Sequence, residues 1–438
     1  MTTATSTQSS LLPNASGKGN YSIAELNANF KPTFDSRSKN MYSTLDVLEG
    51  RMKKKFNFTG SEKNLETQLS FAGGFGARLL PKANNSLMEN QKIIAKKVYG
   101  RALVDREGLK AASNSQGAYQ QYLKFPIKKT VEGYVNQCGR ILFSDGSGIL
   151  GRGDAATNVA GTGAVNDPFL VVISEATWKR HNFHKKAFVQ LVTGLAALPS
   201  NLGGAMEGGD ALTNILEVVS VNDATRTIGL IGVSAGLTAL SGVGPLPATS
   251  GFCMQRSYLG EPTGLNEALL KTTGTFQGIA IQPEWKAGQL NAGGQGIITD
   301  MINEMMLERQ DEFGEEPNMI VCRWNQYQKI LAQIEDKKVY NLPNKNVKGH
   351  LGFEGIEYVC SSGKKISIVT HRHADADKVY LLNDAYLERL HRPDFGWFDE
   401  DGTVFLRTTE DEYEARYGGY WEHQIVPTAH AVIFNLAK

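Results

Sequence analysis

Hydrophobic positions follow a helical spacing in one long stretch, GAYQQYLKFPIKKTVEGYVNQCGRILF, residues 117–143. Its apolar side chains recur at i, i+3, i+4 and i+7, the pattern of an amphipathic helix. They are Ile127, Val131, Tyr134, Val135, Cys138, Ile141 and Leu142. At ~1.5 Å per residue, this helix would be a rod of roughly 40 Å. Pro126 is expected to kink it or to mark where its regular part begins. The glycine-rich SDGSGILGRGD after it predicts its end.

Two strand-like runs separated by a polar segment occupy residues 66–107. The runs are ETQLSFAGGFGARLL and KIIAKKVYGRALVDRE, and PKANNSLMENQ lies between them. They predict a long hairpin whose basic residues are Arg78, Lys82, Lys92, Lys96, Lys97, Arg101 and Arg106. Because two strands alone are only marginally stable in water, we expect this hairpin to rest on something else, such as a neighbouring subunit.

The remaining pattern divides into a mobile arm, a β-rich section and an α/β lobe. Residues 1–30 are polar, and a short helix is expected over residues 39–56. Residues 165–262 are β-rich, and NILEVVSVNDATRTIGLIGV predicts a hairpin with an Asn-Asp turn. A second amphipathic helix is predicted over residues 297–313. The strands NMIVC, IEYVC, KISIVT and KVYLLN, with the helix NQYQKILAQIE, then predict a compact lobe with a central sheet. HAVIFNL predicts a final strand.

Length and composition indicate a soluble, globular protein. A chain of 438 residues suggests two or three lobes. The first residues lack the basic and apolar regions of a secretory signal, and the four cysteines are widely spaced, which favours a reducing compartment. Residues 227–255 carry no charge, but their six glycines and two prolines suit a membrane span poorly. We therefore expect no membrane partner.

Charge is distributed unevenly, although the formal net charge is only +1. Residues 1–144 hold 21 Lys and Arg against 10 Asp and Glu, whereas the remainder holds 25 against 35. The asymmetry suggests that one part of the chain attracts another part or another copy. For Lys53–Lys55, contact with another copy of the chain is favoured over contact with nucleic acid.

The pentapeptide Gly232-Val233-Ser234-Ala235-Gly236 matches the G-x-S-x-G nucleophile elbow of serine hydrolases. An elbow needs a buried strand before it and a long helix after it. Here the preceding strand is one arm of a predicted hairpin, and Gly242, Gly244, Pro245 and Pro247 interrupt the segment after the serine. A tight β-turn is the favoured interpretation, and a serine hydrolase using Ser234 is kept as an alternative.

Two further motifs fail the same test of context. Gly146, Gly148 and Gly151 give G-x-G-x-x-G, but they come after a helix, whereas a dinucleotide fingerprint must precede one. His371, His373, Asp375 and Asp377 in HRHADAD could share one face of a strand and bind a metal. A polar hairpin loop explains the same residues. The sequence therefore predicts no catalytic, cofactor-binding or metal site.

Three stretches, which follow one another along the chain in the expected order, resemble parts of the major capsid proteins of tailed bacteriophages. RILFSDGSGILG (140–151) resembles the end of their long helix. VYGRALVDREGLKAA (98–112) is similar to the strand that leads back to that helix. VYLLNDAYLERLHRPDFGWFDEDGTVFLRTTEDEYEARYGGYWEHQIVPTAHAVI (379–433) resembles their C-terminal block. Together they cover about a fifth of the chain.

The resemblance implies an α+β protein with the HK-97-like capsid fold. Its parts would be an N-terminal arm (1–62), an extended loop (63–112), the spine helix of the peripheral domain (113–150), a β-rich section of that domain or an insertion (151–284), an α/β axial domain (285–390) and a C-terminal return to the peripheral domain (391–438). The role of residues 165–262 is left open. Residues 1–30 are too short and polar for a helical scaffolding segment, which implies a separate scaffolding protein or none.

The implied function is structural, without catalysis or cofactor. Copies would assemble into hexamers and pentamers, forming an icosahedral shell around double-stranded DNA that is bound without sequence specificity. Portal, scaffolding and decoration proteins are the other implied partners. The shell would form in the bacterial cytoplasm and become the virion capsid. An encapsulin-like nanocompartment is the alternative on the same fold. The residues expected at subunit interfaces are Arg78, Lys96, Arg101, Arg106, Asp399, Asp401 and Glu412.

Overall fold

The computed structural model describes most of the chain. The described residues are 48, 51–55, 62–70, 85–106, 116–157, 159–164, 166–196, 205–206, 215–232, 246–335, 357–359, 363, 365–392, 395–399, 404–407 and 412–438. Contacts divide the chain into two compact units. The first comprises Met1–Gly139, Gln277–Ile279 and Leu382–Val426, and the second comprises Arg140–Phe276, Ala280–Leu381 and Pro427–Lys438.

The first unit is organised around one long strand, β22 (Glu412–Ile425). β4 (Lys96–Asp105) pairs antiparallel with β22 along one edge, from Glu412 opposite Asp105 to Trp421 opposite Lys96. Three short strands pair with the other edge, and β1 lies parallel to the first of them. These are β19 (Leu387–His391), β20 (Gly396–Trp397), β21 (Phe405–Arg407) and β1 (Lys53–Lys55).

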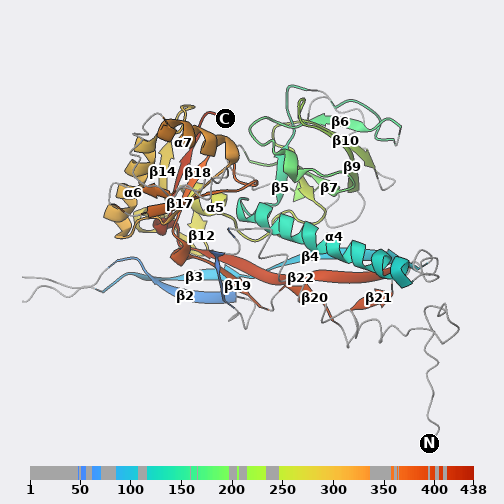
Figure 1. The fold of residues 1–438 in the computed structure, drawn as a ribbon, viewed down its shortest axis with the longest axis horizontal. Helices are drawn as coiled ribbons and strands as arrows, with labels where there is room; N and C mark the ends of the chain where they lie inside the picture. Colours follow the sequence, from blue (N-terminus) through green and yellow to red (C-terminus); the bar gives the residue numbers. More distant parts are fainter. Residues whose placement is uncertain are drawn as a thin grey trace, which may run out of the picture. The chain divides into compact units, whose positions relative to one another are not determined.

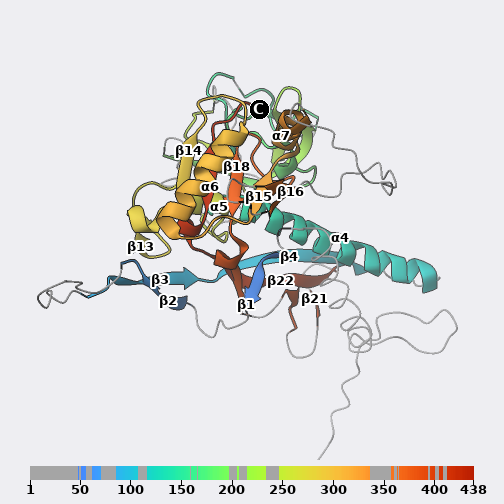
Figure 2. The same cartoon turned by 60° about the vertical axis from the view of Figure 1, so that its left-hand side comes forward.

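The long helix α4 (Gln116–Leu142) lies along β4 and β22 (Figures 1 and 2). All seven apolar side chains of its predicted stripe are buried, which confirms the prediction of an amphipathic helix. Tyr134 meets Tyr417 edge-to-face with 5.2 Å between ring centroids, and Trp421 donates to its hydroxyl at 3.1 Å. Gly100 leaves room beneath the helix, since a Cβ there would lie 3.1 Å from Thr130. The helix continues through Pro126 and ends just before the predicted glycines.

The hairpin of the first unit begins earlier than the sequence pattern predicts. β2 (Glu62–Gln68) pairs with β3 (Met88–Ile94), so the strands include residues that had been expected to precede the hairpin or to separate its runs. The expected helix over residues 39–56 also needs correction. Lys53–Lys55 form β1, because pairing with β19 and an ion pair of 2.6 Å between Lys55 and Glu388 stabilise extended backbone there.

The second unit contains the predicted α/β lobe. Its sheet has the order β14-β23-β18-β15-β17-β16. The strands are β14 (Gly288–Asn291), β15 (Met319–Cys322), β16 (Glu357–Val359), β17 (Lys365–Thr370), β18 (Val379–Leu382) and β23 (Ala431–Phe434). The helices α6 (Thr299–Phe313) and α7 (Trp324–Glu335) bury Ile302, Met306 and Ile330 in one core with this sheet. Tyr380 of β18 contacts α5 (Leu265–Leu270) through Asn266.

The β-rich section forms a closed barrel within the second unit. Its strands have the order β5-β11-β7-β9-β10-β6, and a bridge from Gly153 to Ile173 closes the circle. The strands are β5 (Ile149–Arg152), β6 (Phe169–Val172), β7 (Phe188–Thr193), β9 (Ile215–Asn222), β10 (Thr227–Gly232) and β11 (Gly251–Met254), with β8 (Ala205–Met206) beside β7. The β9–β10 hairpin confirms the predicted Asn-Asp turn. Closure removes the exposed edges of a sheet.

The remaining elements are short. They are β12 (Thr275–Phe276), β13 (Ile279–Ala280), η1 (Arg180–Asn182), η2 (Pro283–Trp285), η3 (Asp384–Tyr386) and η4 (Pro427–Ala429). The predicted return of residues 391–438 to the peripheral domain needs one correction, because β23 pairs with β14 and β18. Among the described residues, no helix is both long and apolar enough to cross a membrane.

Candidate assembly surfaces and the buried polar cluster

Three of the residues expected at subunit interfaces lie in one sheet. Lys96 and Arg101 are on β4, and Glu412 is at the start of β22, which pairs with β4. Arg106 comes directly after β4, and Asp399 is exposed two residues after β20. Arg78 and Asp401 lie outside the described residues. The sheet of the first unit thus brings cationic and anionic candidates together on neighbouring strands.

Arg101 already has a partner within its own chain. Its guanidinium binds Glu414 through two hydrogen bonds of 3.0 and 2.7 Å, and Arg416 donates to the same carboxylate at 2.7 Å. Burial alone would raise the pKa of Glu414, but these two guanidinium groups hold it below its usual value. Glu414 was missed by sequence reasoning, although it alternates with Glu412 and Arg416 along the strand EYEAR.

Aromatic side chains lie beside this ion-pair network on the same face of the sheet. Tyr99 is 47% exposed, and its ring packs 5.3 Å from Phe398 and 6.3 Å from Tyr420, centroid to centroid. Partial burial and then the hydrogen bond with Tyr420 raise the pKa of Tyr99 to about 12. Lys97 lies 5.4 Å over the Tyr420 ring. Leu103, 46% exposed, extends the apolar area along β4.

The β2–β3 hairpin exposes apolar side chains along its length. Leu87, Met88 and Ile94 are 45%, 56% and 49% exposed. Of its described apolar side chains, Ile93 alone is fully buried, in a small cluster with Leu390. In the described part of the chain, β2 pairs with no strand other than β3. A hairpin with so little apolar burial gains stability when a further surface covers it.

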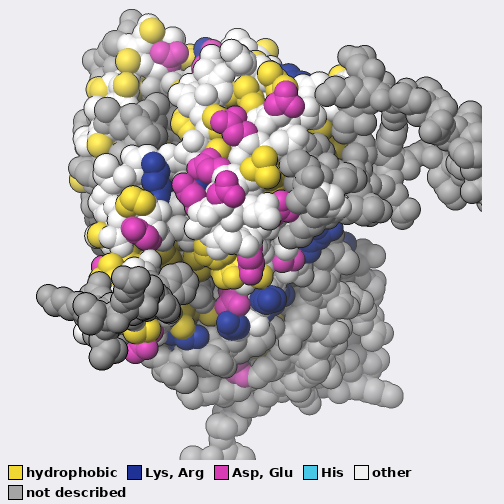
Figure 3. Space-filling view, turned by 90° about the vertical axis from the view of Figure 1, so that its left-hand side faces the viewer, with side chains coloured by type: hydrophobic (Ala, Val, Ile, Leu, Met, Phe, Trp, Pro, Cys, Tyr) yellow, Lys and Arg dark blue, Asp and Glu magenta, His cyan; other side chains and the backbone are white. Residues whose placement is uncertain are grey.

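An acidic face with apolar side chains marks α6 in the second unit. Exposed residues recur near the helical period; they are Asp300, Glu304, Leu307, Asp311 and, just after the helix, Glu315. Leu307 is 43% exposed. Figure 3 shows acidic and hydrophobic side chains side by side on the face of the molecule where α6 lies. Such a mixed surface suits contact with a basic and partly apolar partner.

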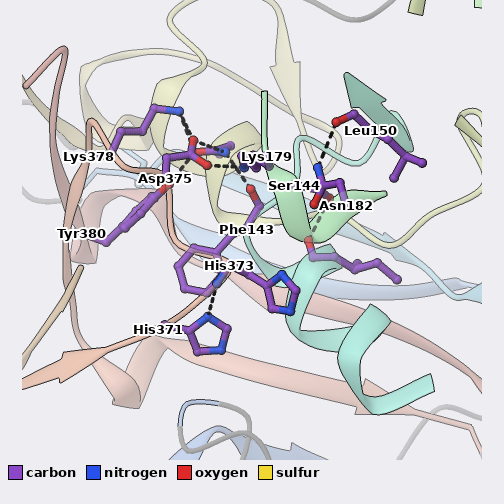
Figure 4. Close-up of polar contacts among 12 residues, drawn as sticks. Phe143, Ser144, Leu150, Lys179, Asn182, His371, His373, Asp375, Lys378 and Tyr380 are labelled. Carbon is purple, nitrogen blue, oxygen red and sulfur yellow. Dashed lines mark hydrogen bonds and ion pairs between the residues drawn. The ribbon is translucent and has the colours of Figure 1, made fainter. Parts of the chain in front are cut away.

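The HRHADAD segment forms the loop between β17 and β18, as predicted, but it is not a hairpin loop, because β15 lies between these two strands in the sheet. Asp375 is buried there and forms ion pairs with both Lys179 and Lys378 (Figure 4). Asn266 donates to the same carboxylate at 3.1 Å and to the Phe143 carbonyl at 2.6 Å. Burial alone would raise the pKa of Asp375, but the two ammonium groups hold it well below its usual value.

Two histidines of this loop pack against aromatic rings outside it, and they form no metal centre with other described residues. His371 packs 4.7 Å from Phe143, and His373 meets His181 edge-to-face at 4.6 Å. Burial, and then the nearby charge of Lys179, lower the pKa of His181 to about 3. Burial lowers the pKa of His373 as well. Within the described ranges, no group of three or more His, Cys, Asp or Glu side chains is arranged to hold a metal ion.

The other two motifs are the G-x-S-x-G pentapeptide and the glycines that follow α4. Ser234 lies outside the described residues, two positions after the end of β10. Gly146 and Gly148 have φ of 74° and 81° and form the turn after α4, and Gly151 belongs to β5. A Cβ at Gly148 would come within 2.4 Å of the Ser257 carbonyl oxygen, so close backbone approach explains that glycine.

Three of the four cysteines are buried free thiols, namely Cys138, Cys253 and Cys322. Burial raises the pKa of Cys253 and of Cys322 to about 12, so both thiols stay protonated near neutral pH. These side chains therefore act as small apolar groups in the core.

Comparison with solved structures identifies the fold. No protein-family model and no curated protein matches the sequence. A chain of the cyanophage A-1(L) capsid asymmetric unit is similar over 90% of this chain and 93% of its own length, with a TM-score of 0.53 and 9% identity. The virus-like particle of Pyrococcus furiosus is similar over 92% of this chain and 99% of its own, with a TM-score of 0.39 and 9% identity. For mycobacterium phage Adephagia the coverage is 89% of each chain, with a TM-score of 0.41 and 7% identity.

The chain therefore has the α+β, HK-97-like capsid fold, as the sequence resemblance predicted. The assignment of α4 to the spine helix and of the β2–β3 hairpin to the extended loop stays a prediction.

Proposed function

We propose that this protein is the major capsid protein of a tailed bacteriophage. Its copies assemble into hexamers and pentamers and form an icosahedral shell around double-stranded DNA. The observation that carries the proposal is the likeness to a cyanophage capsid chain over nine-tenths of both chains. Because one fold can host several functions, the surfaces of this chain supply the second argument.

Those surfaces suit contact with further copies of the chain. The hairpin, the sheet face around Tyr99 and the α6 face all expose large apolar side chains beside charged ones. Closed shells are built from heterologous contacts that recur around rings, so one surface of a subunit must match a different surface of the next. The first 144 residues are basic and the remainder is acidic, so surfaces of opposite charge are available for such a match. Exposed ion pairs contribute only about 0–1 kcal/mol each, so charge sets partner and register more than strength.

The role is structural rather than enzymatic. Asp375, a buried carboxylate of the second unit, is neutralised by two lysines and hydrogen-bonded to Asn266. A carboxylate held ionised in this way stabilises packing and is a poor proton donor or acceptor near neutral pH.

The wider assembly is part of the same proposal. Portal, scaffolding and decoration proteins are its partners, and DNA is enclosed without sequence-specific binding. Assembly takes place in the host cytoplasm, and the finished protein lies in the virion shell. Interface contacts are proposed for Lys96, Arg106, Asp399 and Glu412, together with Arg78, Arg101 and Asp401.

Negative-stain electron microscopy of the expressed chain, alone and with a scaffolding protein, tests the proposal. Closed particles of uniform size are the expected result, and a monomer at all concentrations contradicts it. Double-stranded DNA in particles isolated from infected cells distinguishes a virus capsid from a nanocompartment. Ester hydrolysis that is lost in Ser234→Ala would instead support a serine hydrolase.

A further inference from the structure

The outer edge of β4 is a ten-residue strand edge that no described strand covers. On the edge of β22 opposite to β4, the backbone N–H groups of Arg392 and Phe398 donate to the carbonyl oxygens of Tyr420 and Arg416, respectively. The odd-numbered residues of β22 therefore face β4, and their partners Val98, Gly100 and Ala102 use their backbone groups toward β22. The backbone groups of Lys97, Tyr99, Arg101 and Leu103 consequently point outward, away from β22.

A second strand edge is open in the hairpin. The backbone N–H of Lys92 donates to the Gln277 carbonyl at 2.7 Å, so Lys92 faces away from β2. Gln91 and Ile93 then face β2 and pair with Leu65 and Lys63. The backbone groups of Glu62, Asn64, Glu66 and Gln68 point outward along β2.

The side chains along the two edges have complementary charge at the same spacing. On β4, Lys97 and Arg101 are four residues apart with Tyr99 between them. On β2, Glu62 and Glu66 are four residues apart with Asn64 between them. All six are exposed. Within the described part of the chain, neither Glu66 nor Lys97 makes an ion pair, whereas Glu62 binds Lys92 and Arg101 binds Glu414.

We propose that β2 of one copy pairs with β4 of the next copy and extends its sheet. The strands are antiparallel, which is the commoner and more stable arrangement. Glu66 then lies opposite Lys97, Asn64 opposite Tyr99, and Glu62 opposite Arg101. This inference rests on the proposed function, because it specifies one contact through which the shell subunits join. Strand addition supplies main-chain hydrogen bonds, and the alternate side chains set the register.

The hairpin is a better occupant of this edge than a second β4. Two β4 edges centred on Arg101 would bring two guanidinium groups directly opposite each other, and like charges in that position are destabilising. Pairing with β2 avoids this conflict and matches both cations with carboxylates. It also covers one edge of a hairpin that buries little apolar surface within its own chain.

A designed disulfide tests the register. Directly opposite residues that exchange both hydrogen bonds have Cα atoms ~5.5 Å apart, which suits a disulfide. In a Cys360→Ser background, Asn64→Cys with Tyr99→Cys should give a ladder of covalent multimers on a non-reducing gel after oxidation of assembled particles. Each single variant should remain monomeric on the gel. Particles that give no ladder overturn the proposal. Dimers from Tyr99→Cys with Leu103→Cys would show β4–β4 pairing and overturn it as well.

A charge exchange provides an independent measurement. Lys97→Glu and Glu66→Lys should each raise the critical concentration of assembly about two- to fivefold, as expected from the loss of one cross-strand ion pair. The double variant should return it to near the original value. A double variant as weak as the two single changes combined contradicts the proposal.

The outcomes also separate this inference from the proposed function. If the unmodified chain forms no particles, the proposed function fails. If particles form but show neither the ladder nor the recovery, only the β2–β4 contact fails.

Discussion

Asp375 is a charged side chain inside the second unit, and the groups around it determine whether that charge stabilises the fold. Lys179 reaches it from beside η1, Lys378 from its own loop and Asn266 from α5. Asn266 also accepts from the Tyr380 hydroxyl at 2.9 Å. One carboxylate therefore ties the end of α4, the loop before η1, α5 and the β17–β18 loop together.

Asp375→Asn should destabilise the protein, because it leaves two ammonium groups beside a neutral amide. Removing one partner of a buried ion pair costs about 3–5 kcal/mol, and the partial exposure of Lys179 favours the lower end. Urea unfolding of the unassembled chain measures the change. Asp377→Asn, in the same loop but only half-buried, is the matched control and should change the unfolding free energy by less than about 0.5 kcal/mol. Equal effects of the two substitutions would contradict this role of Asp375.

The histidines of the second unit should make its stability depend on pH. Facing His181 are Lys179, Arg323, Arg372, Asp375 and His373. Because the folded pKa of His181 is about 3, the folded protein stays unprotonated there while the unfolded chain takes up a proton below pH ~6.5. Stability contributed by His181 is thus complete above pH ~6.5 and falls as the pH approaches 3. Asp375, whose folded pKa is lowered, loses its contribution only below about pH 4.

Urea midpoints at pH 7 and pH 5 test this expectation. Acidification should cost about 1–2 kcal/mol through His181, so His181→Phe should lose correspondingly less stability between the two pH values. His184→Phe is the comparison. Burial and the nearby Arg180 also lower the pKa of His184, but less than that of His181, so this variant should keep most of the original pH dependence. An unchanged dependence in His181→Phe would show that this ring does not carry the effect.

At the scale of elements, the sequence predicted what local periodicity encodes. The α4 stripe, the β9–β10 turn and the α6 and α7 helices can be read from spacing alone. The helix predicted over residues 39–56 was wrong at Lys53–Lys55, because β1 forms there by pairing with a strand more than 300 residues away. For the same reason, the Asp375 cluster was only half predicted. HRHADAD marked the loop, but nothing in it indicated Lys179 or Asn266.

Two glycines on neighbouring elements should respond oppositely to the same substitution. A Cβ at Gly418 on β22 would lie 2.1 Å from the Val98 carbonyl oxygen of β4, whereas nothing lies within 4 Å of a Cβ at Gly133 on α4. Gly418→Ala should therefore destabilise the first unit by about 1–3 kcal/mol by separating the strands. Gly133→Ala should stabilise the protein by about 0.5–1 kcal/mol through helix propensity. Thermal unfolding compares them, and a Gly418→Ala variant as stable as the original protein would contradict the packing of β4 on β22.

For the whole molecule, the opposite charges of the two parts of the sequence concern the rate of association more than its final strength. Residues 1–144 carry a local net charge of +11 and the remainder −10. Charges of opposite sign steer partners together over distances comparable to the Debye length, which shrinks from ~10 Å at 0.1 M salt to ~3 Å at 1 M. Hydrophobic burial beneath the hairpin and around Tyr99 would be screened little by salt, so we expect it to maintain the proposed assembly.

Raising the salt concentration from about 0.1 to about 1 M should slow the initial rate of assembly at least severalfold, while the final yield of particles at high protein concentration changes little. Light scattering measures the rate, and sedimentation of the products gives the yield. Sodium chloride and potassium glutamate at equal ionic strength should act alike, since screening depends on ionic strength and not on the identity of the ion. A rate that rises with salt would mean that apolar contacts already limit the encounter, and that the charge asymmetry serves a different partner.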